Sequence, residues 1–379
     1  MEAAITNNYQ RFRLYNKDFL KYDLVSGLVV FLVAIPLCLG IAIASGAPLL
    51  SGIISGILGG LVVGLLSDSQ VSVSGPAAGM ATIVVTTIAE LGGFNGFLAA
   101  LIVAGGIQIL IGSLKAGFIA DYVPSNVVQG LLCAIGLLLI IKQLPLAFTL
   151  SSNIHELQTH LLETTEGFTF LPFQELMNHV NNGAIIISLI SFFVLYYFDK
   201  TRQIILKEIP GTIVVVILGI LINEGFVLYG SPLAQNSPQL VNIPKLMGFE
   251  HLLQQVTVHD LSSWQNPKVY FYGFIIAIIA SLETLLNVKA AEKLDKKRRY
   301  YSKDHELMAQ GVGNLLAGFI GGLPITSVIV RTSVNIQAGA KTKLATILHG
   351  LFILLAIRYL PEVLNKIPLC SLAAILIYT

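Results

Sequence analysis

The segment GGLPITSVIVRTSVNIQAGA, residues 321–340, places one charged side chain, Arg331, in an otherwise apolar and small-residue stretch. Its core, residues 324–339, begins with a proline and is shorter than the roughly 20 residues that a spanning helix needs. The segment SVSGPAAGMATIVVTTIAE, residues 72–90, is similarly short and carries a proline, Pro76, near its start. We therefore expect two half-helices, each preceded by a short β-strand, that begin partway across a membrane.

The composition supports a membrane protein. Of the 379 residues, 55% are hydrophobic and only 12% are charged, whereas a soluble domain carries about a quarter charged residues. We expect an all-α membrane protein whose further spanning segments are 24–45, 51–66, 97–114, 125–144, 183–198, 210–223, 269–288, 306–322, 344–360 and 368–379.

The distribution of positive charge favours a topology with the N-terminus in the cytoplasm. If the two half-helices count as crossings, 17 of the 23 Lys and Arg residues lie inside and 5 lie outside. This bias agrees with the positive-inside rule. Without the half-helices as crossings, Lys115, Lys341 and Lys343 would lie on the wrong side.

A weak internal repeat relates the two half-helices. Pro36 precedes Pro76 by 40 residues, and Glu283 precedes Pro324 by 41 residues. In each case a long helix is followed by a second helix and then by a proline-led half-helix, and the two units cross the membrane in opposite orientations. Inverted repeats with paired broken helices indicate a secondary transporter whose site lies near the bilayer midplane.

Arg331 is the first candidate for the site. An arginine at the centre of a spanning helix costs about 2.5–3.5 kcal/mol, and it stays charged. The half-helix starts, 77–80 and 325–329, expose unpaired N–H groups and partial positive charge, so that together with Arg331 they predict an anion site. Two alternatives remain open: Arg331 pairs with Glu283 as a helix clamp, or it extends to the cytoplasmic face.

Glu283 is the second candidate, because a carboxylate this deep in an apolar helix is rare. Asn287 follows at i+4 on the same helix face. With the Thr326 side chain or the Ile325 carbonyl, these residues could hold Na⁺ or a proton as a coupling ion. The alternative is that Glu283 only neutralises Arg331.

Other features favour structural roles. Gly52, Gly56, Gly60 and Gly64 form a four-residue ladder that suits close helix packing, and the three cysteines lie in separate apolar runs as small buried residues. The basic run 293–299 sets the topology or contacts anionic lipid.

No nucleophile–base pattern, phosphate-binding loop or dinucleotide fingerprint occurs, which argues against an enzyme or an ATP-driven pump. No cofactor or certain metal site is predicted.

Three segments resemble the SulP anion permeases, the bacterial side of solute carrier family 26: 33–46 (VAIPLCLGIAIASG), 73–80 (VSGPAAGM) and the long block 281–343. The resemblance implies fourteen membrane segments in two inverted repeats of seven. Segments 1–4 and 8–11 would form a core domain, and segments 5–7 and 12–14 a gate domain. The family usually adds a cytoplasmic STAS domain and tends to form homodimers. This chain would end in segment 12, so we expect a fragment of a longer protein.

Mapped onto this chain, the resemblance implies the following organisation: 1–22, a cytoplasmic segment; 23–118, core; 119–224, gate; 225–268, an extracellular connection; 269–361, core; 362–379, an incomplete part of the gate. It also implies a substrate cavity lined by Leu37, Ile41, Pro76, Ala77, Ala78, Ile329, Val330 and Arg331. In the sodium–bicarbonate branch, the ion ligands correspond to Glu283, Ala77, Asn287, Ile325 and Thr326.

Three of these positions depart from the family pattern. Ala77 stands where the sodium-binding members carry a hydroxyl group, and Asn287 stands where they carry threonine. Leu37 stands where many sulfate-transporting members carry glutamine. The first two weaken the expectation of a sodium site, and the third weakens sulfate as the substrate.

The sequence thus predicts a secondary transporter of a small inorganic anion, of the sulfate or bicarbonate type, that works as an elevator coupled to H⁺ or Na⁺. We expect a multi-pass homodimer in the bacterial inner membrane, with no nucleic-acid partner. Two alternatives stay open. One is a nucleobase-type permease of the same architecture, in which Glu283 would bind a neutral base, and the other is a membrane scaffold or sensor without transport activity.

Overall fold

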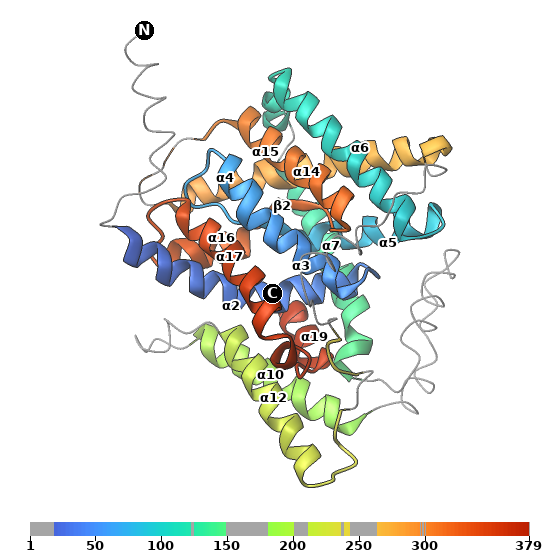
Figure 1. The fold of residues 1–379 in the computed structure, drawn as a ribbon, viewed down its shortest axis with the longest axis vertical. Coiled ribbons are helices and arrows are strands. Elements are labelled where there is room, and N and C mark those ends of the chain that lie inside the picture. Colours follow the sequence, from blue (N-terminus) through green and yellow to red (C-terminus); the bar gives the residue numbers. More distant parts are fainter. Residues whose placement is uncertain are drawn as a thin grey trace. The chain divides into compact units, whose positions relative to one another are not determined.

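The computed structural model describes residues 19–122, 125–148, 181–200, 211–235, 239–242, 264–295, 297, 299 and 301–378 (Figure 1). The chain divides into two compact units. The first comprises the described residues within Met1–Gly136 and Lys245–Tyr359, and the second those within Leu137–Pro244 and Leu360–Thr379. Most of the predicted segments 1–22 and 225–268 lie outside the described residues.

The first unit contains both half-helices. Its elements are α2 (Leu20–Ala44), α3 (Leu49–Leu58), η2 (Gly59–Val63), α4 (Gly64–Leu66), β1 (Ser74–Pro76), η3 (Ala78–Met80), α5 (Ala81–Glu90), α6 (Phe94–Ser113), η4 (Ala116–Asp121), α14 (Pro267–Leu294), α15 (Lys303–Ile320), β2 (Ile325–Ser327), α16 (Ile329–Gln337) and α17 (Leu344–Tyr359). Helix α7 (Ser125–Phe148) begins in this unit and ends in the second.

The second unit is smaller. Its remaining elements are α10 (Asn182–Lys200), α12 (Gly211–Leu228), α18 (Pro361–Leu364) and α19 (Leu369–Tyr378). Helices α10, α12 and α19 pack against one another, and the Ser188 hydroxyl donates a 2.5 Å hydrogen bond to the Ala147 carbonyl at the end of α7. The division between the two units falls at Gly136, inside α7.

The predicted helices are confirmed. Each of the ten expected spanning segments coincides with a helix, to within six residues at either end. Among the described residues, 6 helices are long and apolar enough to cross a membrane. The two shorter segments are also as expected, because β1 leads into η3 and α5, and β2 leads into α16.

The glycine ladder lies at helix contacts, as its spacing predicts. A Cβ atom on Gly56 would lie 2.7 Å from the Cys38 sulfur of α2, and one on Gly60 would lie 2.5 Å from the Gly350 Cα of α17. Figure 1 shows α3 and α17 beside α2, in agreement with the packing of these elements. The glycines therefore let three helices approach to backbone contact.

Local sequence signals explain where α15 begins and ends. The Ser302 hydroxyl accepts a hydrogen bond from the His305 N–H at the start of the helix. The helix stops at Gly321, whose φ of 91° is a left-handed conformation that favours glycine. This stop directs the chain into Pro324 and β2, which places the second half-helix inside the unit.

Candidate functional site

The two half-helices start from a two-stranded antiparallel sheet. Gly75 pairs with Thr326, Ser74 with Ser327, and Pro76 with Ile325. The Val328 N–H extends the ladder by donating to the Val73 carbonyl at 2.9 Å. Because the two strands are antiparallel and each runs into its helix, the two helices leave the sheet in opposite directions. Their positive N-terminal ends therefore both point at the sheet.

Neither helix start is closed by a side chain. Both η3 and α16 lack a side-chain hydrogen bond at the N-cap. The first N–H groups of a helix have no acceptor within the helix itself. Ala78, Ile329 and Val330, at these starts, are partly exposed, whereas Pro76 and Ala77 are buried. Uncapped N–H groups at a helix start are groups that can bind an anion.

Glu283 lies at the first of these helix starts. Its side chain is partly exposed on α14, and its carboxylate lies against Gly79 of η3. A Cβ atom on Gly79 would lie 3.0 Å from Oε1 and 3.1 Å from Oε2 of Glu283. The absence of a side chain at Gly79 therefore lets the carboxylate approach the positive end of the half-helix, where negative charge is stabilised.

Arg331 points elsewhere. Its side chain is fully buried, and Nη2 donates to the Cys38 sulfur at 3.3 Å while Nη1 packs against Gly75. Nε and Nη1 have no hydrogen-bond partner in the described part of the chain. The guanidinium therefore extends into the interior of the first unit, towards α2 and β1.

The structure bears on the two alternatives that were left open for Arg331. The structure contains no ion pair between Arg331 and Glu283, although both residues are described. Extension to the cytoplasmic face is wrong, because the side chain has no exposed surface and contacts Cys38 in the middle of α2. Neither the clamp nor the extended conformation occurs in this structure.

The other predicted cavity residues lie on elements that contact one another. Leu37 and Ile41 are 4% and 3% exposed on α2, which packs against α5, α16 and β1. The elements that carry the predicted substrate residues thus adjoin one another, and the substrate cavity itself stays a prediction. Only Ala78, Ile329 and Val330 of that set have appreciable exposed surface.

The predicted ion ligands gather where α14 meets β2, but part of their hydrogen-bonding capacity is used there. The Asn287 Nδ2 group donates to the Ser327 carbonyl at 2.6 Å, and the Thr326 hydroxyl donates to the same oxygen at 3.3 Å. The Ile325 carbonyl accepts a 3.0 Å hydrogen bond from Asn314. Asn287 and Asn314 thus hold β2 in place, and Glu283 alone of the predicted ligands presents a charge beside it.

Polar residues of the spanning helices form a supporting network that the sequence analysis did not single out. Oδ1 of Asn314 on α15 accepts a 2.6 Å hydrogen bond from the Ile325 N–H, and its Nδ2 donates to the Ile325 carbonyl at 3.0 Å. The same Nδ2 group donates to the side-chain Oε1 of Gln108 at 2.7 Å. Gln108 of α6 in turn donates to Ser281 of α14 at 3.2 Å. All three side chains are buried. The sequence does carry a signal for this network, because amide side chains within apolar helices often form hydrogen bonds between helices.

Two small residues were also missed. Cys38 was expected to be an inert buried side chain, but its sulfur is the acceptor for Arg331. Gly75 was not singled out, although a Cβ atom there would overlap Nη1 of Arg331. Both contacts join residues more than 250 positions apart, so that no local pattern indicates them.

A helical bundle built around two opposed half-helices on a small sheet defines a class of membrane transporter fold. The model of the sulfate permease family matches residues 20–379. The chain therefore belongs to that family, whose members are multi-pass membrane transporters of small inorganic anions. This family membership confirms the expectation drawn from the three resembling segments.

Curated relatives agree with this assignment. The chain is 27% identical over 368 residues to the YvdB protein of Bacillus subtilis (strain 168), named for sulfate transport, covering 97% of the chain and 65% of the relative. It is 24% identical over 362 residues to the bicarbonate transporter BicA of Picosynechococcus sp., covering 93% and 60%. The chain thus spans less than two thirds of the length of these relatives.

Solved structures share the fold. The transmembrane domain of a cyanobacterial bicarbonate transporter BicA gives a TM-score of 0.79 at 23% identity, with 96% of this chain and 88% of that chain covered. The structure of SLC26A9 gives a TM-score of 0.72 at 20% identity, with 96% and 57% covered. At these identities the likeness establishes the fold, which is the predicted one.

Proposed function

We propose that this chain carries small inorganic anions of the sulfate or bicarbonate type across the membrane. The observation that supports this proposal most directly is the pair of uncapped helix starts at the β1–β2 sheet, with the buried charge of Arg331 behind them. The partly exposed residues at these starts, Ala78, Ile329 and Val330, would contact the anion. Backbone N–H groups would replace its hydration shell.

The proposed mechanism is secondary active transport by an elevator. The first compact unit, which holds both half-helices, would act as the core domain, and the second unit would act as the gate domain. The core would carry the anion across the membrane as a rigid body. We further propose that the protein works as a homodimer in the bacterial inner membrane, with its N-terminus in the cytoplasm.

A competition panel tests the substrate. The full chain, reconstituted into proteoliposomes, would take up labelled bicarbonate or sulfate while chloride and dicarboxylates compete at fixed Na⁺ and pH. Because Leu37 offers no hydrogen bond at the position where many sulfate transporters carry glutamine, we expect bicarbonate to compete more strongly than sulfate. Absence of uptake of every anion tested would leave the scaffold or sensor alternative.

One observation favours a second candidate, the nucleobase-type permease. Among the described residues at the helix starts, Glu283 offers the partly exposed charged side chain, whereas Arg331 is buried away from them. A carboxylate in that position could accept hydrogen bonds from a neutral base. Uracil or xanthine that stabilises the protein in a thermal shift assay, where bicarbonate and sulfate do not, would support this candidate.

We expect replacement of Glu283 with glutamine to uncouple transport from its driving ion. The Glu283 carboxylate, against the start of η3, would bind Na⁺ or H⁺ beside the anion, and glutamine keeps its shape without its charge or a titratable proton. The variant should lose the response of anion uptake to a Na⁺ gradient or a pH step, with uptake at least about tenfold lower, corresponding to roughly 1.4 kcal/mol.

Glu292→Gln is the matched control for this variant. Glu292 lies on the same helix, nine residues further along and away from the half-helix starts. It should retain the wild-type response. If Glu283→Gln responds to Na⁺ and pH like the wild type, Glu283 is not the coupling residue, and the second candidate gains support.

A further inference from the structure

A cluster of lysine and aromatic side chains surrounds the N-terminal end of α2. The Lys21 and Lys341 ammonium groups lie 5.0 and 5.3 Å from the centre of the Tyr22 ring, and the Lys297 ammonium group lies 5.7 Å from the centre of the Phe19 ring. These five residues, the basic–aromatic patch, come from the start of α2 with its N-cap Phe19 and from the connections that follow α14 and α16. Lys21, Tyr22 and Lys297 are exposed, and Lys341 is partly exposed.

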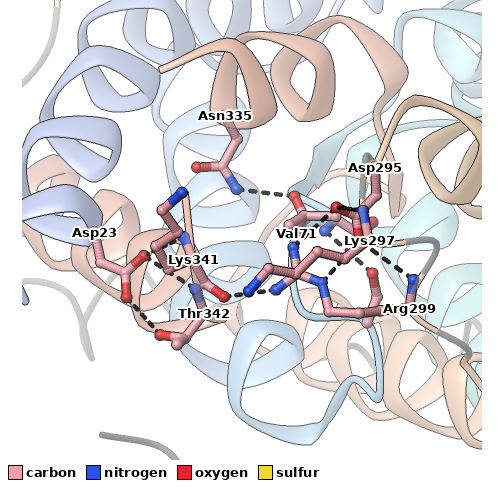
Figure 2. A network of polar contacts seen from close by, with 10 residues as sticks. Asp23, Val71, Asp295, Lys297, Arg299, Asn335, Lys341 and Thr342 are labelled. Atoms are coloured by element: carbon pink, nitrogen blue, oxygen red, sulfur yellow. Dashed lines mark hydrogen bonds and ion pairs between the residues drawn. The ribbon is translucent and has the colours of Figure 1, made fainter. Parts of the chain in front are cut away.

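The patch is held together by a buried carboxylate (Figure 2). Oδ1 of Asp23 accepts hydrogen bonds from the backbone N–H groups of Lys341 and Thr342, at 2.7 and 3.0 Å, and Oδ2 accepts one from the Thr342 hydroxyl at 2.6 Å. Asp23 has no exposed surface. These bonds fix Lys341 beside Tyr22, so that little conformational entropy is lost when a ligand binds.

A second carboxylate fixes the connection that carries Lys297. Arg299 forms a 2.7 Å ion pair with Asp295 and donates a 2.5 Å hydrogen bond to the Lys341 carbonyl, as Figure 2 shows. Burial of Asp295 opposes its ionisation, but hydrogen bonds from Arg299 and from the Lys297 N–H outweigh it and hold the pKa of this carboxyl below its ordinary value. Asp295 thus stays ionised at neutral pH and pairs with Arg299.

The ammonium groups of the three patch lysines are not engaged by the carboxylates that the structure describes. Within the described part of the chain, none of their ammonium groups forms an ion pair with a carboxylate. Asp23 and Asp295, the acids nearest in the network, are occupied by backbone N–H groups and by Arg299. The patch therefore presents three positive charges to an external ligand.

An exposed apolar stripe continues from the patch along α2. Leu24, Val25 and Leu28 are 46%, 56% and 46% exposed on the same side of the helix. In a helix that spans a membrane, such a stripe faces lipid acyl chains. Positive charges at the head-group level next to an apolar stripe match the two chemical parts of an anionic phospholipid.

We propose that an anionic phospholipid binds at the basic–aromatic patch. Its phosphate group contacts Lys21, Lys297 and Lys341, and an acyl chain lies along Leu24, Val25 and Leu28. The proposal is independent of which solute is transported. The positive-inside bias of the sequence places this end of α2 at the cytoplasmic leaflet, which is rich in anionic lipid. A bound lipid would tie together the ends of three helices of the first unit.

Lipid titration of the full chain in detergent tests the proposal. Phosphatidylglycerol should bind and raise the thermal unfolding midpoint, whereas phosphatidylcholine should do so weakly. Each lysine near a charged membrane surface contributes about fivefold in affinity. The triple variant K21Q/K297Q/K341Q should therefore bind phosphatidylglycerol about a hundredfold less tightly. Native mass spectrometry of the same samples would count the bound lipids.

Three further samples make the result decisive. Lys268→Gln, at the opposite end of α14 and paired with Glu90, should bind like the wild type. The triple Lys→Arg variant should keep the affinity, because it keeps the charge. Inorganic phosphate alone should not reproduce the shift. If the triple glutamine variant does not fold, the exposed single variant Lys21→Gln decides. Equal binding of both lipids, or unchanged binding by the glutamine variants, would overturn the proposal.

Discussion

Replacing Arg331 with glutamine is expected to lower anion uptake about 30-fold without destabilising the fold. A unit charge roughly 8 Å from an anion contributes about 2 kcal/mol at an effective dielectric constant near 20, which corresponds to that factor. Stability should hold, because Nε and Nη1 have no acceptor in the described part of the chain and the remaining bond is to a thiol. Uptake into proteoliposomes and the thermal unfolding midpoint would be measured on the same preparation.

The stability of the Arg331 variants shows whether the arginine charge serves anion binding or only holds the fold together. A buried arginine that clamps a carboxylate would cost about 3–5 kcal/mol on removal of its partner charge. Arg331→Lys keeps the charge and should retain more uptake than Arg331→Gln. Arg358→Gln, at the end of α17 beside Tyr359, removes a positive charge far from the sheet and serves as the control. Unchanged uptake together with a large loss of stability in Arg331→Gln would contradict the prediction.

A negative and a positive side chain lie near the two half-helix starts, but at different positions. Glu283 lies directly against the first start, and Arg331 lies behind the sheet near the second, within the first unit. An anion at the helix starts would thus meet a fixed cation that it cannot touch and a carboxylate that repels it unless that carboxylate is protonated or binds a cation. This arrangement supports the proposal that anion transport is coupled to H⁺ or Na⁺.

Much of the fold follows from the sequence. Proline followed by a short apolar segment predicts each half-helix, and the positive-inside count requires both as crossings. Gly321 and Pro324 together indicate where α15 ends and β2 begins. These signals are local or depend on composition, so that they can be read without knowledge of tertiary contacts.

The orientation of Arg331 could not be predicted in this way. The sequence places it on the second half-helix, and resemblance places it in the cavity wall, but its side chain follows the space left by Gly75 and the acceptor offered by Cys38. Both neighbours lie on other elements. Asn314 lies only 11 residues before Ile325, but its hydrogen bonds to the Ile325 backbone depend on how the chain turns between α15 and β2.

The packing of α6 against α15 gives the second large effect. We expect Gly105→Ala to destabilise the chain by about 3 kcal/mol. A Cβ atom on Gly105 would lie 2.5 Å from the Leu315 nitrogen and 2.7 Å from the Gly311 carbonyl oxygen, so that backbone would have to move. A denaturant titration in detergent would measure the change.

Gly106→Ala is the matched control, because Gly106 is the next residue on α6, is exposed, and a Cβ atom added to it would meet no described atom within 4 Å. Alanine there should be neutral or stabilising by about 0.5–1 kcal/mol. Gly105→Ala should also reduce uptake beyond its effect on stability. Separation of α6 from α15 pulls Gln108 away from Asn314, which holds Ile325 of β2. Equal stability of the two variants would show that α6 and α15 do not pack through their glycines.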